Sequence, residues 1–456
     1  MKCVVGIDLG STTTKAVLVD EDGEVLGRGI TNSRSSYEAA CAVAREEALT
    51  AARFALLRRA AEQLPDALQA AQWLGPLQAT FRLELHLDEL DDLRRTILGH
   101  VQRNLKHRDL RQTLEAATQI VLDGAEADAA KVFLEGANKK SDFFRDIAGA
   151  SFMAGAERLA REGAVPFEPF VALFDRAILE VETRVRPRDT VTLLRRASRR
   201  LGFDRGVAGE TIGDVVERLL EGAAGERIEE VAFSGTGYGR QTLPFPKSCV
   251  RSEILCHGRG AHRVFPGTRT VLDIGGQDTK AIQVDEAGVV SGFQMNDRCA
   301  AGCGRYLGYI ADELGLGLHE LGPLALSAKK TVKVCSTCTV FAGAELRERL
   351  AIGQRREDVL AGLHRAIMLR AMSILARSGG VRDEFTFTGG VCNNGMATKV
   401  LRQLVDENYS SSVRLNIHPD SIYMGALGAA LFALDDVRAG KPGLLPTFAQ
   451  PIAGAA

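Results

Sequence analysis

The sequence predicts an α/β protein built from two related halves, each opening with a strand, a glycine-rich turn and a second strand. In residues 4–15 a short apolar run ends in Asp8, and a glycine turn follows. Residues 271–280 repeat this order of residue types, with Asp273 at the end of the apolar run and two glycines after it. A third glycine turn, at 389–390, also follows a predicted strand. Two copies of one arrangement in a single chain predict an internal duplication.

The composition of these turns suits a phosphate ligand. Glycines let backbone N–H groups approach a phosphate closely, and Thr12, Thr13 and Lys15 add hydroxyls and positive charge. A carboxylate at the strand end, Asp8 or Asp273, is placed to hold a divalent cation directly or through water. We therefore expect the two halves to clamp one nucleotide. A single turn of this kind is also compatible with an ordinary hairpin, so the hypothesis depends on the repetition.

Residues 37–205 predict a mostly helical insertion in the first half. Apolar residues recur at intervals of three and four over 87–105 and again over 170–181, as in amphipathic helices. Residues 81–87 alternate between apolar and polar, which predicts a brief strand before the first of these helices. The expected division is a first ATPase half (1–36 and 206–266), the insertion (37–205), a second half carrying the clustered cysteines (267–437) and a loose tail (438–456).

The bulk composition excludes several classes of protein. The chain has 456 residues, enough for two or three domains, and a net charge of −1, so no basic surface for nucleic acid is indicated. No apolar stretch approaches the roughly 18 residues of a membrane span, and the first residues lack the pattern of a secretory signal. We therefore expect a cytoplasmic protein without nucleic-acid or membrane partners.

Four of the nine cysteines cluster in two short motifs. Cys299 and Cys303 lie in NDRCAAGCGRYL, and Cys335 and Cys338 lie in CSTCTVFA. In a cytoplasmic chain, such clusters indicate metal or redox chemistry rather than disulfides. Each motif precedes a predicted helix, where exposed N–H groups and the helix dipole favour a thiolate. The spacings are compatible with an iron–sulfur cluster or with Zn²⁺ held within one chain.

The three glycine turns together resemble those of the actin/Hsp70/sugar-kinase superfamily, whose duplicated ribonuclease H-like domains bind ATP and Mg²⁺ between them. The resemblance implies that Asp8 and Asp273 contact the Mg²⁺ ion or its bound waters and act in hydrolysis. It implies that the nucleoside lies against Gly389, Gly390 and Asn393. The residues that it implies for phosphate binding are Gly10, Ser11, Thr12, Thr13, Lys15, Gly275, Gly276 and Gln277.

The cysteine motifs narrow this resemblance. With VLDIGGQDTK before them and TGGVCNNG after them, they resemble the BadF/BadG/BcrA/BcrD and 2-hydroxyacyl-CoA dehydratase activator family over residues 3–35 and 225–437. The resemblance implies a [4Fe–4S] cluster shared across a subunit interface, with Cys299 and Cys338 as the ligands from this chain. Cys303 and Cys335 are additional thiols and weaker candidates. We favour the shared cluster over Zn²⁺ because both motifs begin helices and because a zinc site would give ATP hydrolysis no process to drive.

The length of the chain indicates which type of family member it resembles. The helical insertion resembles the added sequence of the larger ATPase subunit of ATP-dependent (class I) benzoyl-CoA reductase. That resemblance implies a subunit that couples ATP hydrolysis to low-potential electron delivery from ferredoxin, through the shared cluster. The electrons would reduce benzoyl-CoA, or a close analogue, to a cyclic dienoyl-CoA in anaerobic aromatic degradation. The implied partners are a smaller homologous ATPase subunit, two acyl-CoA-binding catalytic subunits and ferredoxin.

Two alternatives stay open from the sequence. A homodimeric ATP-dependent activator of a 2-hydroxyacyl-CoA dehydratase would use the same residues and differ only in its electron acceptor. A non-redox kinase or a zinc-bearing regulatory ATPase would use the glycine turns without iron. The sequence shows no sugar-binding constellation, which disfavours a sugar kinase.

Overall fold

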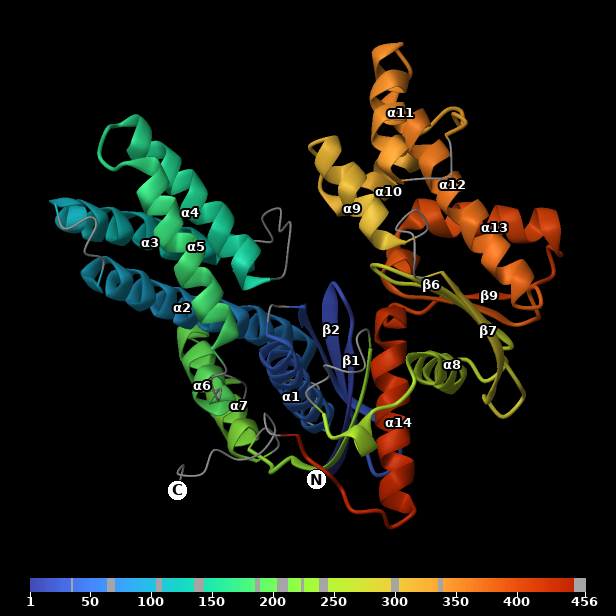
Figure 1. The fold of residues 1–456 in the computed structure, drawn as a ribbon. Helices are drawn as coiled ribbons and strands as arrows, with labels where there is room; N and C mark the ends of the chain where they lie inside the picture. The colour runs from blue at the N-terminus through green and yellow to red at the C-terminus, as the bar shows by residue number, and fades with distance from the viewer. Residues whose placement is uncertain are drawn as a thin grey trace. The chain divides into compact units, whose positions relative to one another are not determined.

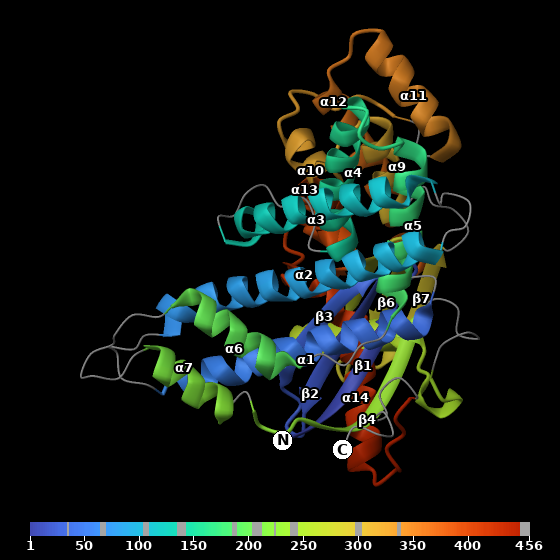
Figure 2. The same ribbon diagram turned by 90° about the vertical axis from the view of Figure 1, so that its left-hand side faces the viewer.

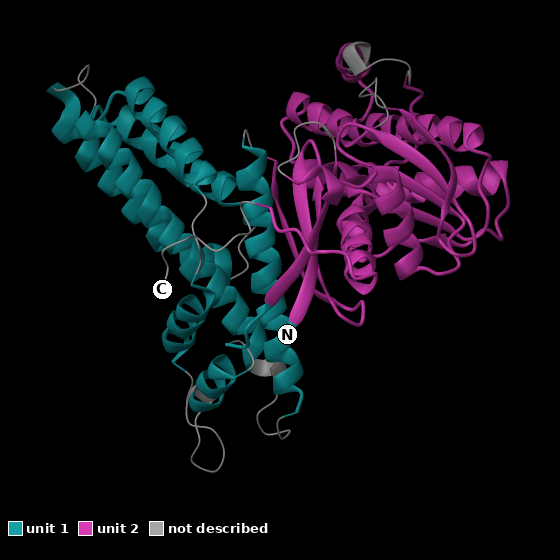
Figure 3. Ribbon diagram, turned by 60° about the horizontal axis from the view of Figure 1, so that its bottom comes forward, with its two compact units in different colours: residues 1, 34–228 teal, residues 2–33, 229–456 magenta. Residues whose placement is uncertain are grey.

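The computed structural model describes residues 1–33, 36–63, 70–103, 109–134, 143–184, 189–202, 212–222, 225–237, 245–296, 303–334 and 339–446. The chain forms two compact units, one of Met1 and Arg34–Ile228 and the other of Lys2–Ser33 and Glu229–Ala456 (Figure 3). The first is a helical unit, and the second is an α/β unit that carries both sheets (Figure 1).

The first sheet of the α/β unit has the strand order β3-β2-β1-β4. β1, β2 and β3 form an antiparallel meander, and β4 runs parallel to β1. The near-continuous apolar runs of β1 and β2 are buried, as expected for central strands covered on their faces. The strands are β1 (Lys2–Leu9), β2 (Thr13–Asp20), β3 (Val25–Asn32) and β4 (Glu229–Gly237).

The second sheet repeats the order of the first, as β7-β6-β5-β8-β9. β5, β6 and β7 again form an antiparallel meander, and β8 runs parallel to β5. β9 adds a short parallel strand at the edge, beside β8. The strands are β5 (Thr270–Ile274), β6 (Thr279–Val284), β7 (Val290–Asn296), β8 (Phe385–Thr388) and β9 (Leu415–Asn416).

The duplication extends to single residue pairs. Asp8 lies opposite Lys15 on β2 and opposite Thr236 on β4. Asp273 lies opposite Lys280 on β6 and opposite Thr388 on β8. The predicted fold, an α/β protein of the actin/Hsp70/sugar-kinase type with duplicated halves, is therefore confirmed.

Each half also ends its parallel strand with a glycine that has a positive φ. Gly237 follows Thr236 with φ of 132°, and Gly389 follows Thr388 with φ of 85°. A Cβ at Gly237 would lie 2.1 Å from the Leu9 carbonyl oxygen, and one at Gly389 would lie 2.3 Å from the Ile274 carbonyl oxygen. Only glycine permits this close approach of the two parallel strands at their ends.

Helices cover the sheets of the α/β unit. α14, rich in Ala and Gly, packs against β1, β2 and β4, and α8 contacts both α14 and β6. α12 and α13 pack on one another, and together with α10 they share one apolar core with β5 and β8. The helices are α8 (Glu253–Val264), α9 (Gly304–Glu313), α10 (Leu318–Leu326), α11 (Thr339–Ala351), α12 (Arg356–Arg377), α13 (Gly395–Asn408) and α14 (Met424–Arg438), with short 3₁₀ turns η4 (Lys247–Cys249), η6 (Gly390–Asn393) and η7 (Ser421–Tyr423).

α12 is long and apolar enough to meet the length and composition criteria of a membrane span. However, 72% of its apolar window is buried inside the α/β unit, where Ile367, Ala371 and Ile374 belong to the core. Its apolar character is therefore explained by packing on the second sheet.

The described residues of the helical unit form two apolar clusters. One lies among α2, α3, α4 and α5 around Phe152, Phe170 and Phe174, and the other joins α1, α2, α6 and α7 around Trp73. The long helix α2 contributes to both clusters (Figure 2). The helices are α1 (Tyr37–Ala61), α2 (Ala70–Arg103), α3 (Arg111–Leu134), α4 (Phe144–Arg161), α5 (Phe167–Thr183), α6 (Thr190–Leu201) and α7 (Ile212–Glu221).

Two details of the predicted organisation are wrong. The expected strand at 81–87 lies inside α2. α2 packs on both apolar clusters, and it also buries Glu84 against Arg196 and Arg200 of α6. Its apolar residues therefore lie on more than one face of the helix, and in the sequence they alternate with polar residues as they would in a strand. The helix α7, expected in the first ATPase half, belongs to the helical unit.

The second of these differences has a clear physical cause. α7 packs on α6 through Leu194, Val216 and Leu220, which lie in one apolar cluster. An ion pair joins the same two helices, with Arg195 Nε 2.8 Å from Glu217 Oε1. α7 therefore completes the helical unit, and the first half resumes only at β4.

A buried histidine joins α12 to α13. The Nδ1–H of His364 donates to the Leu360 carbonyl at 2.7 Å, and its Nε2 accepts from Asn394 Nδ2 at 3.0 Å. Asn394 is held in this orientation because its Oδ1 accepts from Met396 and Ala397 at the start of α13. The site therefore requires a neutral imidazole, and burial lowers the pKa of His364 below its ordinary value of 6.5.

We expect the unfolding free energy to fall as the pH drops below about 6.5, because His364 then binds a proton in the unfolded chain but not in the native protein. The slope from this group approaches about 1.4 kcal/mol per pH unit. Denaturant titrations at several values between about pH 7.5 and about pH 5.5, the range in which histidine titrates, measure this slope. The same series on His364→Gln should be flatter, whereas His262→Gln, at a partly exposed site, should match the wild type. Equal slopes for His364→Gln and the wild type would contradict the assignment.

Candidate functional site

The two glycine turns predicted from the repeated motifs meet in the α/β unit. A Cβ added at Gly276 would lie 2.3 Å from Thr12 Oγ1 and 3.7 Å from Ser11 Oγ. Ser11 and Thr12 are exposed, and Gly275, Gly276 and Gln277 are partly exposed, so the turns form an accessible edge. Residues that are far apart in the sequence are thus brought to one place with backbone N–H groups on both sides.

The first acidic residue of the site, Asp8, lies at the end of β1 and is only 3% exposed. Its Oδ2 lies 3.6 Å from Lys15 Nζ on the neighbouring strand. Its Oδ1 is buried and has no hydrogen-bond partner among the described residues. A buried carboxylate oxygen without a partner is costly, and a cation or a cation-bound water would satisfy it.

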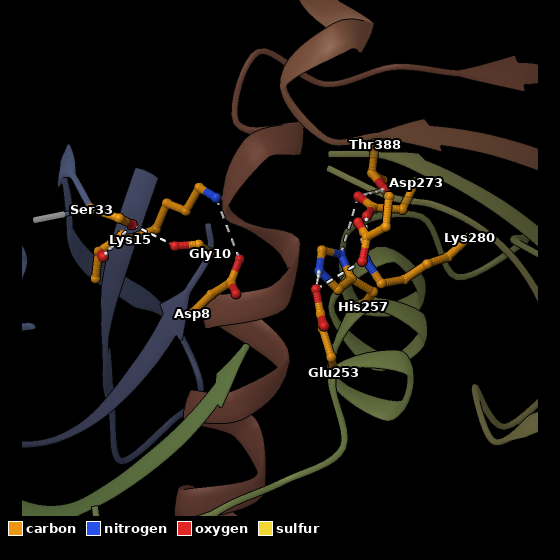
Figure 4. A network of polar contacts seen from close by, with 11 residues as sticks. Asp8, Gly10, Lys15, Ser33, Glu253, His257, Asp273, Lys280 and Thr388 are labelled. Carbon is orange, nitrogen blue, oxygen red and sulfur yellow. Dashed lines mark hydrogen bonds and ion pairs between the residues drawn. The ribbon is translucent and has the colours of Figure 1, made fainter. Parts of the chain in front are cut away.

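The second acidic residue, Asp273, is also buried but is surrounded by partners (Figure 4). Thr388 Oγ1 donates to its Oδ1 at 2.9 Å, and Lys280 Nζ lies 3.5 Å from its Oδ2. His257 Nδ1 lies 3.3 Å from Oδ1. Burial acts to raise the pKa of Asp273, but His257, Lys280 and the Thr388 hydrogen bond outweigh it and lower the pKa. Asp273 is therefore a carboxylate at neutral pH.

The structure adds two residues of α8, Glu253 and His257, that the sequence did not indicate as site residues. Glu253 Oε1 lies 2.9 Å from Lys280 Nζ and 3.9 Å from His257 Nε2. The spacing of four residues, which places both side chains on one face of a helix, is the signal that could have found them. Without the tertiary structure nothing in the sequence aims that face at β5 and β6.

Lys280 is the most deeply buried cation of this network, at 1% exposure. It lies 2.7 Å from Asp278 Oδ1 in addition to its contacts with Glu253 and Asp273. Burial acts to lower the pKa of Lys280, but the three carboxylates raise it, so the ammonium stays charged. Burial raises the pKa of Asp278.

The third glycine turn lies against the end of β5. Gly389 is buried against the Ile274 carbonyl, whereas Gly390 and Asn393 are exposed in η6. Asn394, the next residue, caps α13. The predicted nucleoside residues thus lie on the α/β unit at the same end of β5 as Asp273 and the second glycine turn.

Most of the cluster thiols lie outside the described residues. These are Cys299, Cys335 and Cys338. Cys303 is described: it is 1% exposed and directly precedes α9 as its N-terminal cap residue. α11 begins at Thr339, the residue after Cys338. Both cysteine motifs therefore lead directly into helices.

The start of α9 is hydrogen-bonded to the second glycine turn. The N–H of Gly304 donates to the Gly275 carbonyl at 2.8 Å, and the N–H of Arg305 donates to the Gly276 carbonyl at 2.7 Å. These are the first amides of the helix, which lack partners inside it. A displacement of the Gly275-Gly276 turn would therefore pull directly on the residues that follow Cys303.

Comparison with known sequences identifies the type of protein. Residues 5–433 match the BadF/BadG/BcrA/BcrD ATPase family. The chain belongs to this family. It is therefore an ATPase-family protein.

Individual relatives in this family match about half of the chain. It is 40% identical over 219 residues to the (R)-2-hydroxyglutaryl-CoA dehydratase activating ATPase of Acidaminococcus fermentans, covering 48% of this chain and 81% of the relative. It is 37% identical over 245 residues to the 2-hydroxyisocaproyl-CoA dehydratase activator of Clostridioides difficile, covering 51% and 88%. It is 35% identical over 215 residues to one of the benzoyl-CoA reductase subunits of Thauera aromatica, covering 47% and 75%.

A solved structure supports the fold. The crystal structure of the Acidaminococcus fermentans (R)-2-hydroxyglutaryl-CoA dehydratase component A matches with a TM-score of 0.52 and 22% identity. The match covers 96% of this chain and all of that one. At this identity the likeness concerns the arrangement of the elements alone.

The residues present fit the groups that the family implies. The unpartnered Asp8 Oδ1 and the ionised Asp273 are hard oxygen donors of the kind that Mg²⁺ prefers. Thiols are the donors that an iron–sulfur cluster takes, and Cys303, the described member of the four clustered cysteines, lies at a helix N-terminus.

Substitution of Gly276 by Ala should weaken ATP binding by about tenfold. The added methyl group would lie 2.3 Å from Thr12 Oγ1, so the two turns must separate, at a cost of about 1–3 kcal/mol. Fluorescent-nucleotide titration measures the affinity. Gly292→Ala is the matched control, because a Cβ there meets no atom within 4 Å. Unchanged affinity in Gly276→Ala would show that the turns do not share the nucleotide.

Proposed function

We propose that this chain is an ATP-hydrolysing electron-transfer subunit that couples ATP hydrolysis to low-potential electron delivery to an acyl-CoA-processing partner. The observation that supports it most directly is the pair of hydrogen bonds from Gly304 and Arg305 to the Gly275 and Gly276 carbonyls. They join a glycine turn of an ATP-binding fold to the helix that follows the first cysteine motif.

In this proposal Asp8 and Asp273 act on the Mg²⁺ ion and the water, and the glycine turns bind the nucleotide. Asp8 and Asp273 hold Mg²⁺ and position the attacking water. Gly389, Gly390 and Asn393 receive the nucleoside. The phosphates bind to Gly10, Ser11, Thr12, Thr13, Lys15, Gly275, Gly276 and Gln277.

The coupling runs through the α9 start. The γ-phosphate orders the Gly275-Gly276 turn, and its loss on hydrolysis releases the turn. Because the turn carbonyls hold the first amides of α9, the movement reaches Cys303 and the cysteine motif before it. The ATPase cycle thereby changes the surroundings of the thiols.

The thiols would hold a [4Fe–4S] cluster shared with a second subunit, with Cys299 and Cys338 as first candidates and Cys303 and Cys335 as further ones. Such a cluster supplies one-electron transfer at low potential when bound. A reduced ferredoxin is the proposed donor, and the cytoplasm is the proposed location.

Two acceptors have a specific observation in their favour. The helical unit of Arg34–Ile228 favours the larger ATPase subunit of a benzoyl-CoA reductase, working with a smaller homologous ATPase and two acyl-CoA-binding subunits to reduce benzoyl-CoA to a cyclic dienoyl-CoA. Three relatives with 37–40% identity carry the names of dehydratase activators, which favours a homodimeric activator of a 2-hydroxyacyl-CoA dehydratase.

Anaerobic purification from the native host, with iron, sulfide and zinc analysis, tests the cofactor and the partner together. We expect brown material with equal iron and sulfide. Co-elution with a smaller homologous chain and two further subunits supports the reductase, and a lone homodimer supports the activator. Zinc without sulfide would instead favour a regulatory ATPase and would end the electron-transfer proposal.

Asp273→Asn should lower the ATPase rate by about a hundredfold or more and leave the visible spectrum of the cluster unchanged. The carboxylate is removed from the nucleotide site, whereas the thiols are untouched. Glu286→Gln, an exposed acid in the β6–β7 turn, is the control and should keep the full rate. An ATPase rate unaffected by Asp273→Asn would refute the role of Asp273 in hydrolysis.

A further inference from the structure

The side chains of Asp8, Glu253 and His257 converge on one point beside α14. One ligand atom from each lies within 4.8 Å of the others, and all three belong to the α/β unit. Asp8 comes from β1, and the other two come from one face of α8 (Figure 4). Neither α8 residue belongs to the glycine turns that define the nucleotide site.

Gly425 keeps this point open. A Cβ at this position of α14 would lie 2.8 Å from His257 Nε2 and 3.0 Å from Asp8 Oδ2. Any other residue would therefore occupy the space that the imidazole and the carboxylate face. The space between them exists because the α14 residue nearest to both has no side chain.

Two buried polar atoms around this point have no hydrogen bond to any described residue. Asp8 is 3% exposed, and its Oδ1 has no partner. His257 is 4% exposed, and its Nδ1 lies 3.3 Å from Asp273 Oδ1 without forming an aligned hydrogen bond. The unsatisfied Asp8 Oδ1 indicates a missing ion or water, whereas Nδ1 of His257 faces Asp273 and Nε2 faces the shared point beside Gly425.

The net charge of the acidic and basic side chains around this point also favours a bound cation. Among the described residues, the carboxylates of Asp8, Glu253, Asp273 and Asp278 face two ammonium groups, those of Lys15 and Lys280. The excess is two negative charges when all four acids are ionised. Buried charge without compensation costs several kcal/mol per ion, and a divalent cation would offset it.

We propose that Asp8, Glu253 and His257 bind a first-row divalent transition cation of the Mn²⁺ class, with His257 Nε2 as a direct ligand. A nitrogen donor with two carboxylates suits such ions, whereas Mg²⁺ prefers oxygen ligands alone. Asp273 lies on the Nδ1 side of the same ring, in the place of the carboxylate that commonly orients a metal-binding histidine. Glu253 Oε1 lies 3.9 Å from His257 Nε2, within the roughly 4.2 Å that separates two ligands on opposite sides of an ion at about 2.1 Å.

The proposal uses Asp8 of the nucleotide site but does not depend on the cysteine motifs or on electron delivery. It can fail while the proposed function stands, and the reverse also holds. The test therefore needs no ATPase activity and no partner, and it uses Mn²⁺ as the probe because thiolates are poor ligands for it.

Full-length protein freed of nucleotide should bind one Mn²⁺ per chain, measured by electron paramagnetic resonance titration. Pulsed measurement of the bound ion should show ¹⁴N coupling from an imidazole, and an excess of Mg²⁺ should displace the ion poorly. Absence of binding, or a bound ion without ¹⁴N coupling, would overturn the proposal. The second result would mean that oxygen ligands and water alone hold the ion.

His257→Gln should remove the ¹⁴N coupling and weaken Mn²⁺ binding by at least about tenfold. His262→Gln is the matched control, because His262 lies on the same helix but is partly exposed and contacts the Glu286 carbonyl. Gly425→Ala should also block binding by filling the space between the ligands. Circular dichroism checks that each variant is folded, and tight binding by folded His257→Gln would overturn the proposal.

Discussion

Burial of two aspartates, Asp8 and Asp273, is the constraint on which the rest of the α/β unit depends. Removing a carboxylate from water costs several kcal/mol unless a charged partner compensates it. Each sheet provides that partner in the same register, as Lys15 on β2 and Lys280 on β6. The hairpins of both halves thus bring an acid and a lysine together across neighbouring strands.

The two halves have diverged in how completely they satisfy their acid. Thr388 donates to Asp273, whereas Thr236, at the equivalent position, donates to the Arg251 carbonyl. Asp273 therefore has a full set of partners, and Asp8 keeps a buried oxygen without one among the described residues. A duplicated fold has thereby produced one acid that is held firmly by the protein and one that remains available to an ion.

Small residues decide which segments can meet. Gly276 lets the second glycine turn touch Thr12, and Gly425 lets α14 pass close to both Asp8 and His257. The carbonyls of the second turn then accept the first amides of α9. One short turn is thereby in contact with the other turn and with the helix that follows the cysteine motif, which is the connection that the proposed function uses.

The sequence alone determined the duplicated halves, the acid-and-glycine turns and the helical character of the insertion, because these depend on local order and residue type. Only the tertiary structure decided which faces of these elements are covered. α2 resembles a strand locally at 81–87 because its neighbours bury several of its faces, and α7 joins the helical unit through contacts with α6. Glu253 and His257 stand one helical turn apart in an otherwise ordinary helix, and they become site residues because α8 packs on α14 and β6. A residue type and its spacing are encoded locally, whereas the partner of a buried charge is set by the packing of segments that are remote in the chain.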